Sequence, residues 1–216
     1  HFGKFASSYI KREYFFDVHP PLGKLLFAAV GYLFGYDGSF SFENIGMSYQ
    51  GSRVPYVDMR SVSALCGTLV VSLVYAMLIE MRFSLPVAVL GAFMIAFGIF
   101  IAFQIVNLRI LDNALVTQSR FILLDAQLIF FIVATCFCWV KFRSYTNKPF
   151  SLQWWFWLAG TGFCLGLTLG VKLVGFFVVA AIGVCTILDL WDVMDLKKTS
   201  KEVNLFKFSS ITNSKS

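Results

Sequence analysis

Long apolar runs, separated by short polar connections, dominate the chain from residue 61 onward. A helix needs about 20 consecutive apolar residues to cross the ~30 Å hydrocarbon core of a bilayer. The last two runs are shorter and are separated only by Lys172, so they predict two helices that meet at a short turn. The pattern therefore predicts about five membrane-spanning helices, over Ser61–Ile79, Leu85–Leu111, Phe121–Val140, Leu158–Val171 and Leu173–Leu188.

The residues before the first predicted span have a mixed pattern. Leu22–Phe34 is apolar but too short to cross a bilayer, so it predicts an interfacial helix or a re-entrant segment. Residues 35–58 are rich in Gly, Ser, Asp, Asn and Pro, which is typical of a loop. We therefore divide the chain into a first loop with its interfacial helix (1–60), a bundle of spans (61–196) and a polar tail (197–216) that is either cytoplasmic or spurious.

The composition agrees with a membrane protein and excludes other classes. Of the 216 residues, 58% are hydrophobic and only 14% are charged, against roughly 25% in soluble domains. A soluble domain of this size could not bury so much apolar surface. The net charge of +6 comes from scattered basic residues, so we expect no binding of nucleic acid. We predict an all-α fold, a polytopic transmembrane helical bundle.

Basic residues in the short connections predict how the bundle is oriented. They gather at three places that five spans would put on the same face: Arg82, the 141–148 connection and Lys197–Lys201. By the positive-inside rule, this face is cytoplasmic. Residues 1–59, the 112–120 connection and the Lys172 turn then share the opposite face.

Charged and polar residues on that opposite face are candidate functional groups, because charges at membrane depth are costly. Arginine can hold a phosphate with two parallel hydrogen bonds, and lysine can do so as a point charge. Carboxylates beside such cations suit a substrate that is linked to a lipid phosphate. The candidates are Asp17, His19, Arg60, Asp112, Asn113, Arg120, Asp125 and Lys172.

Each candidate also has a purely structural explanation. Arg60 could snorkel from the end of a helix, and Asp125 could form a buried ion pair with Arg120. His19 could cap a loop, and Lys172 could be an interfacial anchor. Asp112-Asn113 could cap a helix. The five cysteines lie inside apolar runs without the spacing of a zinc pair, so no metal site is predicted.

Several ordered motifs resemble a known family. In the first loop they are His1–Ala6, Tyr14–Lys24, Gly35–Gly38, Phe42–Gly46, Val54–Val57 and Met59-Arg60, and further along they are Asp112–Asp125, Pro149–Ser151 with Trp154-Trp155, and Val171–Gly175. Together they resemble the dolichyl-phosphate-mannose–protein O-mannosyltransferases, over roughly residues 1–97 and 112–198. The resemblance implies a class C glycosyltransferase fold in the endoplasmic reticulum membrane, with several spans and a lumenal first loop.

The same resemblance implies an activity. Mannose would pass from dolichyl-phosphate mannose to Ser or Thr hydroxyls of lumenal proteins, with inversion at the sugar and no further cofactor. A carboxylate would act as general base, and cations would stabilise the departing phosphate. Asp17, His19 and Arg60 match catalytic segments of the family, and we expect Asp112, Asn113, Arg120, Asp125 and Lys172 to contact substrate. A dimer with another family member is also implied.

The sequence departs from the family pattern at two places that bear on activity. The family carries an acidic Asp-Glu pair just before the motif that begins here at His1, so we expect this chain to be an inactive fragment by itself. Gly98–Leu111 resembles an insertion into the family's third helix. A non-catalytic membrane partner, or a lipid-phosphate binder of the same fold, is the alternative interpretation; a transporter fragment is a third.

Overall fold

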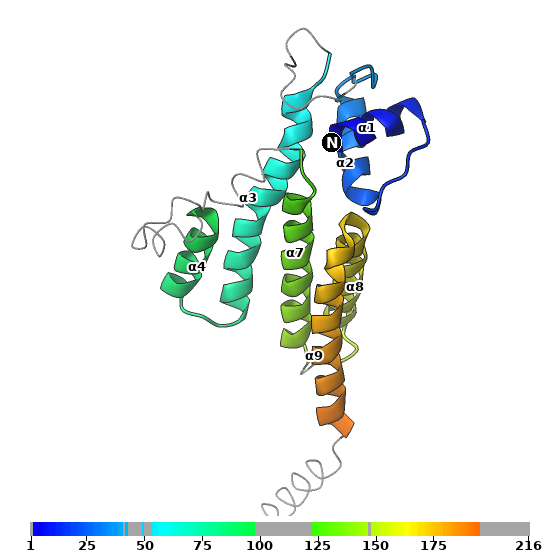
Figure 1. Ribbon diagram of the computed structural model, residues 1–216. Helices are drawn as coiled ribbons and strands as arrows, with labels where there is room; N and C mark the ends of the chain where they lie inside the picture. Colours follow the sequence, from blue (N-terminus) through cyan, green and yellow to red (C-terminus); the bar gives the residue numbers. More distant parts are fainter. Residues whose placement is uncertain are drawn as a thin grey trace, which may run out of the picture. The chain divides into compact units, whose positions relative to one another are not determined.

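The computed structural model describes residues 2–40, 42, 49, 53–97, 122–146 and 148–194, and every regular element among them is a helix (Figure 1). The predicted all-α fold is therefore confirmed over these residues. The chain divides into two compact units, residues 1–176 and 177–216. Helix α9 (Phe176–Met194) begins at the last residue of the first unit and makes up the described part of the second.

Two short helices precede the long ones. Helix α1 (Phe2–Lys11) packs against helix α2 (Leu22–Leu33), and α2 in turn packs against α3 and α8. The predicted apolar segment Leu22–Phe34 thus forms a helix with nearly the expected bounds. Helix α1 was not predicted, because its mixed residues give a weaker pattern than a continuous apolar run.

The first long helix begins earlier than its apolar pattern. Helix α3 (Tyr56–Glu80) starts directly after Pro55, so the predicted loop ends before residue 58. Proline fixes its own φ and lacks an N–H, which makes it well suited to the start of a helix. Asp58 in the first turn also stabilises the helix, because its negative charge interacts favourably with the positive end of the helix dipole. A tight turn, in which Arg82 has a φ of 64°, leads into helix α4 (Leu85–Phe97).

The next two long helices form a hairpin. Helix α7 (Asp125–Ser144) and helix α8 (Leu152–Val171) pack along each other. Helix α8 begins several residues before the predicted Leu158, because the Ser151 hydroxyl caps it by accepting a hydrogen bond from the Trp154 N–H at 3.2 Å. Lys172 then leaves the helix in an extended conformation, and a single 3-10 turn, η1 (Leu173–Gly175), follows. The predicted turn at Lys172 is confirmed.

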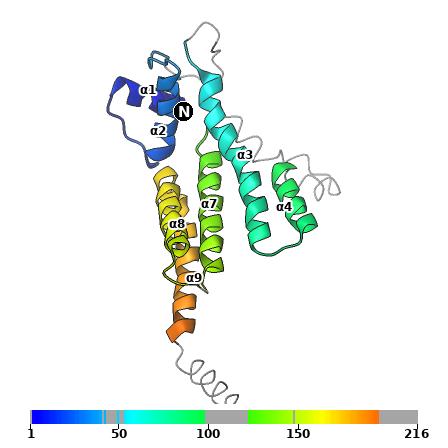
Figure 2. The ribbon, with the colours of Figure 1, turned by 180° about the vertical axis from the view of Figure 1, so that it is seen from behind.

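Contacts at both ends show the directions of these helices. Near their starts, the Ser63 hydroxyl of α3 donates to the carbonyl of Leu123, just before α7, at 3.3 Å. Near their ends, Lys141 of α7 contacts Glu80 of α3 at 2.5 Å. Helices α3 and α7 are therefore parallel, and α8 returns antiparallel to them. Figures 1 and 2 show this arrangement, with α1 and α2 at the end where α3 and α7 begin.

Four helical segments of the described residues are long and apolar enough to cross a membrane: α3, α7, α8 and Leu173–Trp191. Helix α4 has 13 residues, or about 20 Å at 1.5 Å per residue. The remainder of the predicted Leu85–Leu111 span, including the expected insertion Gly98–Leu111, lies outside the described residues. The total of about five spans stays a prediction.

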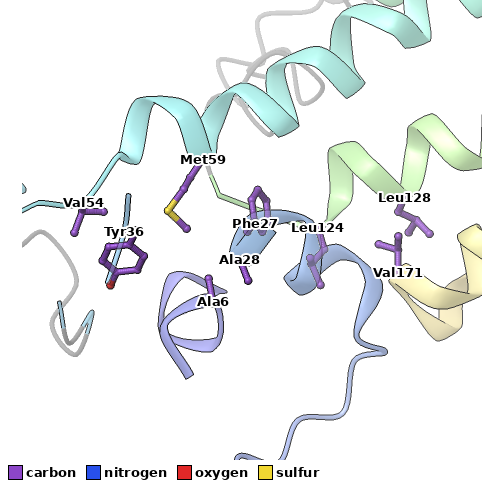
Figure 3. Packing of buried hydrophobic residues seen from close by; sticks show 9 residues of the cluster. All are labelled: Ala6, Phe27, Ala28, Tyr36, Val54, Met59, Leu124, Leu128 and Val171. Carbon is purple, nitrogen blue, oxygen red and sulfur yellow. The ribbon is translucent and has the colours of Figure 1, made fainter. Parts of the chain in front are cut away.

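A buried apolar cluster joins the two short helices to the long ones. It runs from Ala6 of α1 and Phe27 of α2 through Met59 of α3 to Leu128 of α7 and Val171 of α8 (Figure 3). Five helices therefore contribute buried side chains to this end of the bundle. Residues at the start of α3 and α7 consequently have rigid neighbours.

The turn after α2 is also held tightly against α1. Gly38 has a φ of +83°, and a Cβ there would lie 3.2 Å from the carbonyl oxygen of Ser7, so only glycine fits without strain. The hydroxyls of Ser7 and Tyr36 lie 2.7 Å apart. Burial raises the pKa of the Tyr36 phenol. The Gly35–Gly38 motif thus fixes how the first loop folds back on itself.

Candidate functional site

One end of the bundle collects most of the described candidate residues. Arg60 lies in the second turn of α3, Asp125 is the first residue of α7, and Lys172 directly follows α8. The first turn of α2 packs against the same end, because a Cβ at Gly23 would lie 2.5 Å from Leu124 Cδ2. Figure 3 shows Leu124 facing the α2 helix at this junction. The fold therefore brings together segments that are distant in the sequence.

A buried ion pair joins the first loop to α2. Lys24 Nζ lies 2.7 Å from Asp17 Oδ2, and the two side chains are 3% and 8% exposed. The same ammonium donates a second hydrogen bond of 2.7 Å to the carbonyl oxygen of His19. The ring centroids of Phe5 and Phe15 lie 5.2 and 5.5 Å from it. Lys24 is thus enclosed by a carboxylate, a carbonyl and two aromatic rings.

The environment of Asp17 keeps its carboxylate ionised. Burial has the largest single effect and by itself would raise the pKa of Asp17. The hydrogen bond and the charge of Lys24, with smaller contributions from His19 and the Val18 N–H, together lower the pKa below its ordinary value. The carboxylate is therefore charged at neutral pH and is bound to a lysine. An ion pair of this kind can be structural, and the catalytic role expected for Asp17 stays a prediction.

His19 borders an open pocket of about 530 Å³ between α1 and the loop that leads to α2. Its ring lies 6.1 Å from that of Phe2, tilted by 44°. Tyr9, Glu13 and Tyr14 line the same pocket. His19 therefore belongs to the wall of the pocket, and its carbonyl oxygen is held by Lys24.

Arg60 differs from the other described cations of the site in how its charge is surrounded. Its guanidinium carbon lies 5.3 Å from the ring centroid of Tyr56 and 5.9 Å from that of Tyr49. Its Nε atom is buried without a hydrogen-bond partner, and no carboxylate of the described residues forms an ion pair with it. The neighbouring Met59 is fully buried, so the backbone at Arg60 is firmly positioned. Such a guanidinium can accept an anion.

Lys172 and Asp125 form a second ion pair at this end. Lys172 Nζ lies 2.5 Å from Asp125 Oδ1, and both side chains are partly exposed. Among the described residues the partner of Asp125 is Lys172. Arg120, which the sequence left open as a structural partner of Asp125, lies outside the described residues. The pair joins the start of α7 to the end of α8 and leaves the lysine partly accessible.

The remaining predicted site residues, Asp112, Asn113 and Arg120, lie outside the described residues. Two buried polar residues at the site were not predicted from the sequence. One is Lys24, which lies within an apolar run. The other is Gln127, which is fully buried in the first turn of α7 and has no hydrogen-bond partner for either amide atom among the described residues. A polar residue within an apolar segment was the available signal for both.

We expect Gln127→Met to stabilise the full-length protein. Each unpaired buried polar group costs about 1–3 kcal/mol, and methionine has a similar length without polar atoms. The variant should therefore melt at a higher temperature in detergent. Gln127→Glu is the matched comparison, and it should melt lower because it buries a charge. A melting temperature unchanged or reduced in Gln127→Met would show that the amide is satisfied by water or by another group.

The described residues contain no group of three or more His, Cys, Asp and Glu side chains that could hold a metal ion. All five cysteines are free thiols. The described part of the site contains Arg60, the two lysine–carboxylate pairs and His19.

Comparisons with known proteins identify one family for nearly the whole chain. The sequence model of the family described as Dolichyl-phosphate-mannose-protein mannosyltransferase matches residues 1–213. The chain is 42% identical to Dolichyl-phosphate-mannose–protein mannosyltransferase 4 of Candida albicans over 198 residues, which are 92% of this chain and 24% of the relative. It is 43% identical to Protein O-mannosyl-transferase 2 of Danio rerio over 191 residues, 88% of this chain and 23% of that relative.

A solved structure of a related protein also matches this chain. The S. cerevisiae protein O-mannosyltransferase Pmt1-Pmt2 complex bound to the sugar donor matches with a TM-score of 0.79 and 42% identity, over 96% of this chain and 26% of the matched chain. The chain thus spans about a quarter of the length of these relatives. Its described residues include four helical segments suited to membrane spans. The chain belongs to the dolichyl-phosphate-mannose–protein mannosyltransferase family.

Proposed function

We propose that the full-length protein transfers mannose from dolichyl-phosphate mannose to Ser or Thr hydroxyls of lumenal proteins, with inversion at the sugar. The observation that carries this proposal is the guanidinium of Arg60, which has no counterion among the described residues and lies at one end of a helical bundle of this family. The related yeast complex bound to its sugar donor supports the choice of donor. This chain supplies part of that site.

Arg60 binds the donor phosphate in this proposal. When the bond between mannose and phosphate breaks, negative charge grows on the phosphate, and a guanidinium already in place stabilises that charge. Arginine suits this role because its planar fork can make two parallel hydrogen bonds to phosphate oxygens. The rings of Tyr56 and Tyr49 hold the guanidinium without neutralising it.

The other predicted substrate-binding residues also act on the donor in this proposal. Lys172 carries a second positive charge, which Asp125 holds in place at 2.5 Å. Asp112, Asn113 and Arg120 retain the roles in substrate binding that the family resemblance gave them. The proposal gives Asp125 a role in orienting Lys172, since a carboxylate would repel the phosphate if it faced it directly.

Asp17 and His19 have different roles in this proposal. The carboxylate of Asp17 is occupied by Lys24 and is shielded from solvent, so it orients the loop and does not accept the proton of the acceptor hydroxyl. His19 lines the open pocket, and in this proposal its imidazole forms a hydrogen bond to a substrate there. His19 is therefore the group of this motif that contacts substrate.

The location and the partner follow from the same family. We propose that the protein lies in the endoplasmic reticulum membrane with its first loop in the lumen, where lumenal acceptor proteins are available. The related yeast enzyme forms a Pmt1-Pmt2 complex, and we propose a similar dimer for this protein.

A transfer assay tests the proposal. The full-length protein, expressed in membranes that lack endogenous activity of this kind, is given radiolabelled dolichyl-phosphate mannose and a Ser/Thr-containing acceptor peptide. Label should enter the peptide in an alkali-labile linkage and with inverted configuration. A protein that binds the lipid donor but transfers nothing, alone and with each family partner from the same organism, would favour the non-catalytic alternative.

A further inference from the structure

We infer that Lys24 is a positioning residue that holds His19 at the wall of its pocket. The inference rests on the proposed function, because it gives His19 a role in transfer. Lys24 binds two parts of the same short loop at once: the Asp17 carboxylate through Oδ2 and the His19 carbonyl oxygen, each at 2.7 Å. It thereby joins both ends of the Asp17–His19 segment to the first turn of α2.

The sequence around His19 makes this attachment effective. Pro20 and Pro21 follow, and each proline fixes its own φ near about −65°. A residue before proline is also restricted to extended backbone, so His19 has little freedom on its C-terminal side. The bond from Lys24 to the Asp17 carboxylate restricts the chain on the N-terminal side, and the bond to the His19 carbonyl oxygen adds a second restraint on the C-terminal side. With its backbone fixed from both directions, the histidine keeps a fixed Cα–Cβ direction, which limits the positions that its imidazole can reach.

The position of the Lys24 side chain is fixed by several contacts at once. The ammonium lies close to the rings of Phe5 and Phe15, and its side chain is almost wholly buried. A change of rotamer would break both hydrogen bonds and move the ammonium away from both rings. The lysine thus transmits the fixed geometry of α2 to the loop.

Stability alone gives no reason for a charged pair at this place. Removing two charges from water is costly, and a pair of apolar residues of similar volume is often equally stable or more stable. Apolar side chains could not, however, bind the carbonyl oxygen of His19. The hydrogen bond to that carbonyl is the property that only a donor such as lysine supplies.

The test uses a double variant of the full-length protein, Asp17→Asn with Lys24→Met, which removes both charges together. A matched control, Glu80→Gln with Lys141→Met, makes the same chemical change at the opposite ends of α3 and α7. Melting temperature, kcat, and KM for donor and acceptor are measured for both. Misplacement of a reacting group by about 1 Å can cost about 100-fold in rate.

We expect the double variant to melt near the unchanged protein and to show a kcat lower by about 10- to 100-fold, with KM for the donor within about threefold. The control pair should transfer normally. If the double variant transfers as fast as the unchanged protein, Lys24 serves only to neutralise Asp17 and the inference is overturned.

A second variant decides the matter if the double variant fails to fold. Lys24→Arg keeps a cation for Asp17, but the guanidinium is longer and wider than the ammonium, so we expect it to lose the bond to the His19 carbonyl oxygen beside the two rings. The kcat should then fall while the melting temperature is kept. Full kcat in a folded Lys24→Arg protein overturns the inference. Absence of transfer by the unchanged protein would contradict the proposed function instead, and the two failures are therefore distinguishable.

Discussion

Replacing Arg60 by alanine should lower kcat/KM for mannose transfer by about 100- to 1000-fold, the range seen when one preorganised charge-stabilising donor is removed. The guanidinium has no counterion among the described residues, and its Nε is buried without a partner. Its removal therefore takes away a group prepared for an anion and breaks no ion pair there. The measurement is transfer from dolichyl-phosphate mannose by the full-length protein in microsomes.

Two comparisons make the Arg60 experiment decisive. Arg53→Ala removes the same side chain from an exposed position earlier in the chain, and it should leave transfer unchanged. Arg60→Lys keeps the charge but loses the planar fork, so its activity should lie between those of the unchanged protein and Arg60→Ala. Normal transfer by Arg60→Ala would make this arginine a snorkelling anchor, which is the structural explanation that the sequence left open.

The second large effect concerns stability. Asp17→Asn should lower the free energy of unfolding of the full-length protein by about 3 kcal/mol, because Lys24 would remain buried without its carboxylate. Asp37→Asn is the matched control. It makes the same charge change at an exposed position and keeps the oxygen that accepts from the Ser39 N–H. Thermal unfolding in detergent should show a clear decrease for the first variant and none for the second.

The same pair predicts a dependence on pH. Because Lys24 lowers the pKa of Asp17 in the folded protein, the pair stabilises the fold fully above the unfolded pKa, about 3.9. That contribution is lost as the pH falls through the lower, folded pKa. The difference in stability between the unchanged protein and Asp17→Asn should therefore be constant above about pH 5 and shrink below about pH 4. A difference that grew on acidification would contradict the assignment.

The long helices could be predicted from the sequence, because a run of apolar residues has few other stable states in a membrane. The turn at Lys172 and the helix over Leu22–Leu33 followed from the same pattern. Their exact starts could not be predicted. They depend on local features such as Pro55 before α3 and the Ser151 cap of α8, which apolar length does not report.

The site was predictable in its residue types and much less in their pairings. Arg60, Asp125 and Lys172 could be named because a charge near an apolar span needs an explanation. Which charge meets which depends on how α2, α7 and α8 pack. Lys24 is separated from Asp17 by a proline pair, so no helical spacing links them, and their contact of 2.7 Å exists only in the folded loop.

By itself, the sequence determined that this is a helical membrane protein of the mannosyltransferase family, since apolar length and ordered motifs are local properties of the chain. The tertiary structure decided which cations are neutralised: Lys24 and Lys172 bind carboxylates, whereas Arg60 lies beside aromatic rings without a counterion among the described residues. The physical reason is that Coulomb and hydrogen-bond energies depend on distance and burial. Both are set only when α2, α3, α7 and α8 meet at one end of the bundle.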